Sequence, residues 1–180
     1  MAKNSAKRNA LFTTLVYLML KAPQEIARVD QSLMGTIFAL TNEIDDDDIK
    51  ENLLWLQSAL IEVNTSDEQH SKAVELCTEF QSAQCYLQSL KSSNEVIVLQ
   101  AIKGLKSLAA IPQFKAIILI DIGDELFMTL ATILGQRLSR FSQCPLEIEV
   151  ELVGFLAQIT ESSAASKDPL TIAAKRRAVQ

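Results

Sequence analysis

Two groups of acidic side chains come closest, in residue type and spacing, to catalytic or metal-binding chemistry. Four aspartates occupy positions 45–48, and Asp121, Asp124 and Glu125 lie close together later in the chain. Paired carboxylates can act as a general acid and base, and a calcium loop combines alternating acidic ligands with a glycine and a glutamate at a fixed distance. The stretch 45–48 has no glycine. Both groups fit better the acidic residues that stabilise a helix N-terminus.

The other candidates for chemistry are few. His70 is the only histidine and lies in the polar stretch SDEQHSK, and a lone histidine supplies a nucleophilic triad poorly. The chain contains no glycine-rich phosphate loop, zinc-ligand spacing or metalloprotease motif. Cys77, Cys85 and Cys144 form no such spacing, and their odd number indicates reduced thiols that serve as small core residues. We therefore predict a protein that is not an enzyme, without catalytic residues, metal or cofactor, in the cytoplasm or nucleus.

The N-terminal stretch has the outline of a signal peptide. Lys3, Lys7 and Arg8 precede the apolar run ALFTTLVYLML. Two threonines interrupt that run and no small-residue cleavage site follows it, so we expect an amphipathic helix there instead. No apolar run reaches the roughly 18 residues needed to span a bilayer.

Composition favours an all-α fold. The 180 residues include only 5 Gly and 4 Pro, fewer turn residues than a β-rich chain of this length normally needs. Helix-forming residues dominate, and apolar side chains recur with helical spacing along most of the chain. The net charge of −5 does not favour nucleic acid or an anionic membrane.

The stretch AIILIDIGD, residues 116–124, has two interpretations. It could be a buried strand that delivers acidic residues to a loop, or a short helix that ends at a corner marked by Gly123. A strand needs partners, and the chain has no other apolar β-branched run bounded by turns. We therefore predict a helix, with a glycine that permits a left-handed conformation or close packing at the corner.

Internal similarity occurs at two offsets. Pro-Gln at positions 23 and 112 and phenylalanines at 38 and 127 are separated by 89 residues, about two units of roughly 45 residues. A second pairing, at an offset of 50, joins EVIVLQAIKGLKSLA to PLEIEVELVGFLAQI. It matches Val98 with Ile148, Ile102 with Leu152, Gly104 with Gly154, and Leu105 with Phe155.

With these patterns the chain resembles the armadillo and HEAT-type helical repeat proteins. Lys115, Ile118 and Gly123, followed by ELFMTLATIL and CPLEIEVELVGFLAQI, reproduce the order of an armadillo unit. The resemblance implies a right-handed α-solenoid of about four units, with residues 1–180 forming one domain. Because the last helix ends in AAKRRAVQ without a stop signal, we expect this domain to be part of a longer solenoid. Its third helices would be 5–21, 46–63, 94–110 and 145–160. The spacing departs from the family at 68–91, expected as one long helix, and at 139–145, a longer turn.

The resemblance further implies a scaffold or adaptor that holds an extended peptide or an amphipathic helix of another protein in a concave groove lined by third helices. Trp55, the only tryptophan, is a candidate anchor, although it could also fill the core. Importin-like members carry an asparagine one turn after such a tryptophan. Ala59 stands there, which argues against classical nuclear-signal binding. The predicted partner-binding residues are Trp55, Gln57, Gln100, Lys103, Lys106 and Ser107.

Two alternatives stay open. Basic residues at positions 3, 7, 8, 103, 106, 137, 140, 175, 176 and 177 could form a stripe that binds nucleic acid. Alternatively, the chain could be a structural subunit that assembles with copies of itself, because the ends of a solenoid without polar caps are apolar. Leu11, Phe12 and the last helix are where such an end would lie.

Overall fold

The computed structural model describes residues 31–63, 74–139 and 146–161, together with Ala10 and Thr14. Within these ranges every regular element is a helix, which confirms the all-α prediction. The helices are α3 (Gln31–Glu43), α4 (Asp47–Val63), a short helical segment at 74–79, α6 (Ser82–Ser89), α7 (Glu95–Ala109), α8 (Pro112–Asp121), α9 (Gly123–Ser139) and α10 (Leu146–Thr160). The expected helices at 46–63, 94–110 and 145–160 match α4, α7 and α10 closely.

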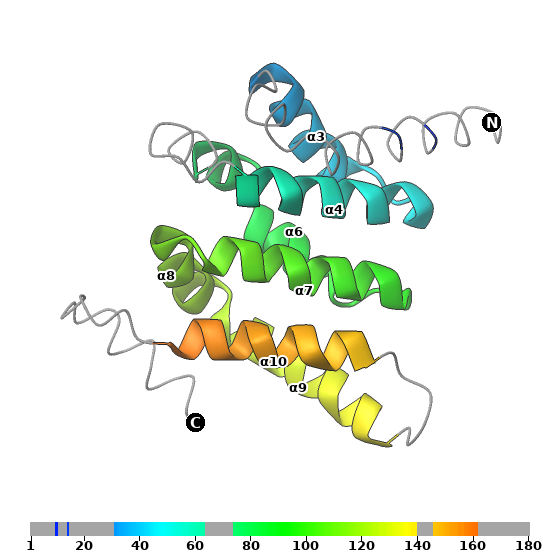
Figure 1. Ribbon diagram of the computed structural model, residues 1–180, viewed down its shortest axis with the longest axis vertical. Coiled ribbons are helices and arrows are strands. Elements are labelled where there is room, and N and C mark those ends of the chain that lie inside the picture. The colour runs from blue at the N-terminus through cyan, green and yellow to red at the C-terminus, as the bar shows by residue number, and fades with distance from the viewer. Residues whose placement is uncertain (1–9, 11–13, 15–30, 64–73, 140–145, 162–180) are drawn as a thin grey trace.

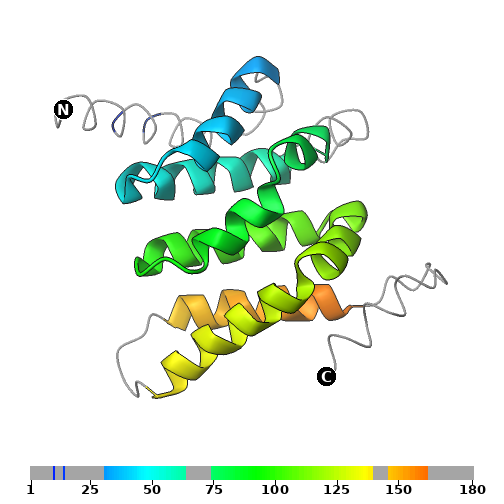
Figure 2. The same ribbon diagram turned by 180° about the vertical axis from the view of Figure 1, so that it is seen from behind.

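The helices form two layers. In Figure 1, α4, α7 and α10 lie side by side and nearly parallel, in the order in which they occur in the chain. We call these three helices the front layer. Figure 2 shows the opposite side, where α3, α6, α8 and α9 cover them. α7 is the central helix, because it packs against α4, α10, α6 and α8.

The hydrophobic core lies between the two layers. α7 contributes Ile97, Ala101, Ile102 and Leu105 to it, all at most 2% exposed. Their spacing follows the helical period, so one face of α7 is continuous with the core while the opposite face is left for polar side chains. α4 and α10 likewise turn an apolar face to the core, and this fixes which face of the front layer meets solvent.

One glycine permits the close packing of α7 on α6. A Cβ atom on Gly104 would lie only 2.1 Å from Cε1 of Tyr86. The Tyr86 ring is fully buried, and its hydroxyl lies 3.3 Å from Oγ of Ser58 on α4. The ring therefore occupies the space that a side chain at position 104 would need.

Most of the acidic residues in the two groups lie at helix N-termini, as predicted, but Asp121 is the last residue of α8 and its placement at a helix N-terminus is wrong. Oδ1 of Asp46 accepts a hydrogen bond of 3.3 Å from the backbone N–H of Ile49, and Asp47 and Asp48 form the first turn of α4. Asp124 and Glu125 lie in the first turn of α9. Carboxylates in these positions interact favourably with the unpaired N–H groups of a first turn.

The stretch 116–124 is a helical corner, so the strand alternative is wrong. α8 ends at Asp121, Ile122 adopts φ −121° and ψ 0°, and α9 begins at Gly123. Of the two roles expected for this glycine, a left-handed conformation or close packing, the first is wrong, because no described glycine has a positive φ. A Cβ atom on Gly123 would make only ordinary contacts, 3.6 Å from the carbonyl oxygen of Ile118.

The predicted single helix over 68–91 is wrong, because the helix is interrupted by a turn at Phe80 and Gln81. Gln81 adopts the left-handed conformation, with φ 48° and ψ 47°, immediately before α6. Nδ2 of Asn42 donates a hydrogen bond of 2.7 Å to the carbonyl oxygen of Phe80, and the Phe80 ring packs on that of Phe38. These contacts with α3 stabilise a break that no glycine or proline marks in the sequence.

Several predictions fall outside the described residues. They concern the helix at 5–21, the ends at Leu11 and Phe12, the turn at 139–145, His70 and Cys144. In the parts that the structure does describe, no helix is both long enough and apolar enough to cross a membrane.

Candidate functional site

A cleft on the front layer brings together side chains from all three of its helices. It has a volume of about 370 Å³. Trp55, Ala59 and Glu62 line it from α4, and Lys106 and Glu151 are among the side chains that line it from α7 and α10. We call it the front cleft. Because each helix turns its apolar face to the core, the cleft receives the opposite faces of α4, α7 and α10.

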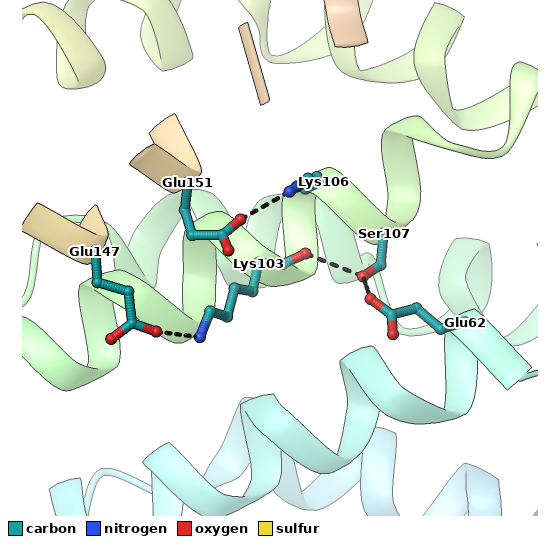
Figure 3. Close-up of polar contacts among 6 residues, drawn as sticks. All are labelled: Glu62, Lys103, Lys106, Ser107, Glu147 and Glu151. Carbon is teal, nitrogen blue, oxygen red and sulfur yellow. Dashed lines mark hydrogen bonds and ion pairs between the residues drawn. The ribbon is translucent and has the colours of Figure 1, made fainter. Parts of the chain in front are cut away.

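Two ion pairs join α7 to α10 beside the front cleft (Figure 3). Nζ of Lys103 lies 2.7 Å from Oε1 of Glu147, and Nζ of Lys106 lies 2.9 Å from Oε2 of Glu151. The two lysines are three residues apart, so both lie on one face of α7. The two glutamates are four residues apart, so both lie on one face of α10. The ammonium charges are therefore balanced within the protein.

A hydrogen bond joins α7 to α4 on the other side of the cleft. Oγ of Ser107 lies 2.7 Å from Oε1 of Glu62, to which it donates, and 3.0 Å from the carbonyl oxygen of Lys103 (Figure 3). Glu62 forms no ion pair with any residue in the described ranges. The central helix is thus connected to both of its neighbours in the front layer by polar side chains.

Four of the six predicted partner-binding residues line the front cleft. They are Trp55, Lys103, Lys106 and Ser107. Trp55 is half-buried and packs against the core, so it fills the core in part, and its role as an anchor for a partner stays a prediction.

The other two predicted residues do not line the cleft. Gln57 is 0% exposed, and its Nε2 donates a hydrogen bond of 2.9 Å to Oγ of Ser82 on α6. Its placement on the groove surface is therefore wrong, since it points into the interface between the layers. Gln100 is half-buried, and its Oε1 is buried without a hydrogen-bond partner.

The acidic residues of the site were not predicted from the sequence. Glu62, Glu147 and Glu151 all contact the predicted residues of α7, across separations of 44 to 45 positions in the chain. That separation is close to the repeat length inferred from the sequence, and it was the available indication. Spacing alone does not establish which side chains meet, because this depends on how the helices stack.

The described residues offer little nucleophilic or metal chemistry. Burial raises the pKa of the Cys77 thiol to about 12, and burial also raises that of Cys85. A thiol with such a pKa is protonated at neutral pH and is a poor nucleophile. Within the described ranges, no three side chains of histidine, cysteine, aspartate or glutamate are grouped as metal ligands would be.

A larger cleft, of about 530 Å³, lies between the α6–α7 connection and α9. Lys91 lines it and forms an ion pair of 2.6 Å with Glu125. Its other side chains include Ser92, Thr129 and Thr132, but no aromatic residue. None of the predicted partner-binding residues line it, so we place the candidate site at the front cleft.

Comparisons of the chain with models of known protein families, with curated proteins and with solved structures find no match.

Proposed function

We propose that this protein is a non-catalytic scaffold or adaptor that binds a segment of another protein on its front layer. In this proposal the stacked helices are units of a right-handed α-solenoid of the armadillo or HEAT type. The observation that carries the proposal is the front cleft, which places a partly exposed tryptophan among polar side chains from three helices. Tryptophan is enriched among the residues that dominate protein–protein binding energy.

Exposed apolar side chains on the same layer support this proposal. Val150 and Val153 on α10 are 60% and 63% exposed. Large aliphatic side chains that face solvent together with an aromatic residue are typical of a protein-binding surface. Lys103 and Lys106, which pair with Glu147 and Glu151 of α10, add polar side chains to the same layer.

Nucleic-acid binding has less support than protein binding. Of the basic residues that were expected to form a stripe, Lys103 and Lys106 have described side chains, and each is paired with a glutamate. A phosphate would have to displace these carboxylates before it could bind. Assembly with copies of the chain remains the other alternative, and a mass that rises with concentration in sedimentation equilibrium would favour it.

Affinity capture from cell lysate tests the proposed function. The bait proteins would be the wild-type chain, Trp55→Ala, and the control Met128→Asp, which alters an exposed side chain on α9 outside the front layer. We expect at least one protein to be captured by the wild type and by the control. We expect Trp55→Ala to lose it, because removal of a central anchor weakens binding by about 2 kcal/mol or more, which is roughly 30-fold.

The captured protein must then bind directly. Its segments would be titrated into the purified chain while the fluorescence of Trp55 is followed, since the chain contains no other tryptophan. A segment that binds with a change in this fluorescence would confirm the proposal. Capture that vanishes after nuclease treatment, or that survives Trp55→Ala, would contradict it. Circular dichroism of each variant checks that the helices are retained.

A further inference from the structure

A polar cleft lies between the end of α3, the start of α4 and one face of α6. It has a volume of about 230 Å³. The side chains that give it its character are Asn42, Lys50, Gln81, Gln84, Cys85 and Gln88. None of its described lining residues is an aspartate or a glutamate. The cleft, which we call the lysine cleft, therefore combines a positive charge with carboxamide groups and has no carboxylate among those residues.

The ammonium group of Lys50 has no partner among the described residues. Lys50 is half-buried, and its side chain forms no ion pair or hydrogen bond with any of them. The other lysines with described side chains contact glutamates or carbonyl oxygens; they are Lys91, Lys103, Lys106 and Lys115. Burial raises the pKa of the Cys85 thiol and the charge of Lys50 opposes this rise, so the ammonium lies close to the cleft wall. An anion bound there would be stabilised by a charge that the described fold leaves unbalanced.

An apolar cleft adjoins the lysine cleft. It has a volume of about 360 Å³, and Gln81 and Gln84 line both clefts. Phe114 and Ile117 of α8 form much of its apolar wall. Asp121, which is exposed, also lines it and would repel a second negative charge. An anion that occupies both clefts is therefore oriented, with its charge beside Lys50 and its apolar part against α8.

Gln81 lies where the two clefts meet. Its φ of 48° makes it the only described residue other than glycine with a positive φ. This conformation is unfavourable for a residue that carries a Cβ atom, and residues held in it are concentrated at ligand-binding sites. The Gln81 side chain is exposed and does not cap α6, although residue 81 is the N-cap of that helix. Its carboxamide is therefore free to donate to a ligand at the junction.

We propose that the two clefts form one binding site for a small organic acid, which places its carboxylate beside Lys50 and its hydrocarbon part against Phe114 and Ile117. One ammonium group balances the single charge of a carboxylate, and carboxamide N–H groups donate to its oxygens. A phosphate monoester carries nearly two negative charges at neutral pH, for which the described lining residues hold one cation. Apolar walls with a few polar groups that fix orientation are typical of small-molecule sites. The two clefts share no lining residue with the front cleft, so this inference goes beyond the proposed function and does not depend on it.

Titration of the isotope-labelled full chain with small probes tests the inference. The probes are acetate, hexanoate, hexanamide and hexyl phosphate, added at constant pH and ionic strength. Two-dimensional NMR spectra report binding at the two clefts through the side-chain amide signals of Gln81 and Gln84. The indole signal of Trp55 reports binding at the front cleft in the same spectra. The backbone amide signals verify that each variant keeps the fold.

We expect hexanoate to bind at least about tenfold more tightly than acetate, because its chain is removed from water. It should exceed hexanamide, which has the same chain without the charge, by a similar factor, and hexyl phosphate should bind no more tightly. Lys50→Met should weaken the binding of both acids by about fivefold or more. Ile117→Ser should weaken hexanoate by about threefold and leave acetate unchanged. Lys91→Met, which removes a lysine outside both clefts, should affect neither acid.

Several results would overturn the inference. Acetate or hexanamide that binds as tightly as hexanoate would show that the chain or the charge plays no part. Binding that is indifferent to Lys50→Met, or that shifts the signal of Trp55 instead of the glutamine signals, would place the site elsewhere. Equal losses for both acids in Ile117→Ser, tighter binding of hexyl phosphate, or no saturable binding of hexanoate would each contradict the assigned ligand. None of these results affects the proposed function, which is tested by capture through Trp55.

Discussion

The contact between Gly104 and Tyr86 gives the sharpest prediction for the fold. In Gly104→Ala, the new Cβ atom would lie 2.1 Å from Cε1, 2.3 Å from Cζ and 2.7 Å from Cδ1 of the tyrosine ring. To restore an ordinary contact of 3.4 Å, the nearest ring atom would have to retreat by about 1.3 Å. The ring is fully buried, so this movement displaces its neighbours too.

The expected free-energy change can be worked out from three contributions. Overpacking of a well-packed core costs about 1–3 kcal/mol. Movement of the ring also breaks the contact between the Tyr86 hydroxyl and Ser58, a loss of about 1 kcal/mol. Replacing a glycine in a helix interior by alanine returns about 0.5–1 kcal/mol. We therefore expect Gly104→Ala to lower the free energy of unfolding by about 1–3 kcal/mol.

Urea denaturation followed by far-ultraviolet circular dichroism measures this change, provided that the slope against urea concentration is unaltered. Gly135→Ala on α9 is the matched control. Its Cβ atom would meet nothing within 4 Å, so we expect stabilisation by about 0.5–1 kcal/mol. In a Tyr86→Val background, Gly104→Ala should likewise become stabilising, because the outer ring atoms are gone. The reasoning would be refuted by a Gly104→Ala variant as stable as the wild type, or by an equal loss in both backgrounds.

Three further predictions concern other parts of the fold. Lys115→Met removes hydrogen bonds of 2.6 Å from Nζ to two carbonyl oxygens at the end of α10, so amide hydrogen exchange in the last turn of that helix should accelerate while that of α4 does not. Asn94→Ala removes the side-chain cap of α7 and should cost about 1 kcal/mol in thermal or urea unfolding, whereas Asn94→Asp should retain most of it. Burial raises the pKa of the Cys77 thiol from 9.0 to about 12 and also raises that of Cys85. The unfolded chain therefore loses these protons first, and the free energy of unfolding should fall as the pH rises from about 9 towards 12, by at most about 1.4 kcal/mol per pH unit for each thiol. Urea titrations across this range would disprove this if stability were constant in the wild type or fell equally in Cys77→Ala.

The helices of the front layer could be predicted from the sequence because local and tertiary preferences agree there. α7 was expected at 94–110 and extends from Glu95 to Ala109. Asn94 caps its start, Pro112 begins the next helix, and the apolar side chains between them have helical spacing. The break at Gln81 could not be predicted in this way. It depends on contacts with Asn42 and Phe38, about 40 positions away in the chain.

The candidate site could be predicted only in part. Trp55 and Lys106 were placed correctly, because they lie opposite the apolar face of their own helices. Gln57 was misplaced, because a polar side chain at the border of that face can either meet solvent or be buried with a hydrogen bond, as it is to Ser82. The glutamates on α10 that neutralise the lysines depend on the register between helices, and one helix does not contain that information.

The sequence pairing at an offset of 50 compares α7 with α10 at core positions and at solvent-exposed positions. Val98 and Ile148 are both buried in the core, as are the paired Ile102 and Leu152. At the same offset, Lys103 of α7 corresponds to the exposed Val153 of α10. The core positions stabilise the described fold, whereas an exposed valine contributes almost nothing to its stability. The two helices also differ at positions that are buried only in α7, because its Ile97 and Ala101 correspond to Glu147 and Glu151 of α10. α7 is apolar there because it packs against a front-layer neighbour on each side, α4 and α10. The pairing therefore reflects the place of each helix in the layer as well as its solvent face.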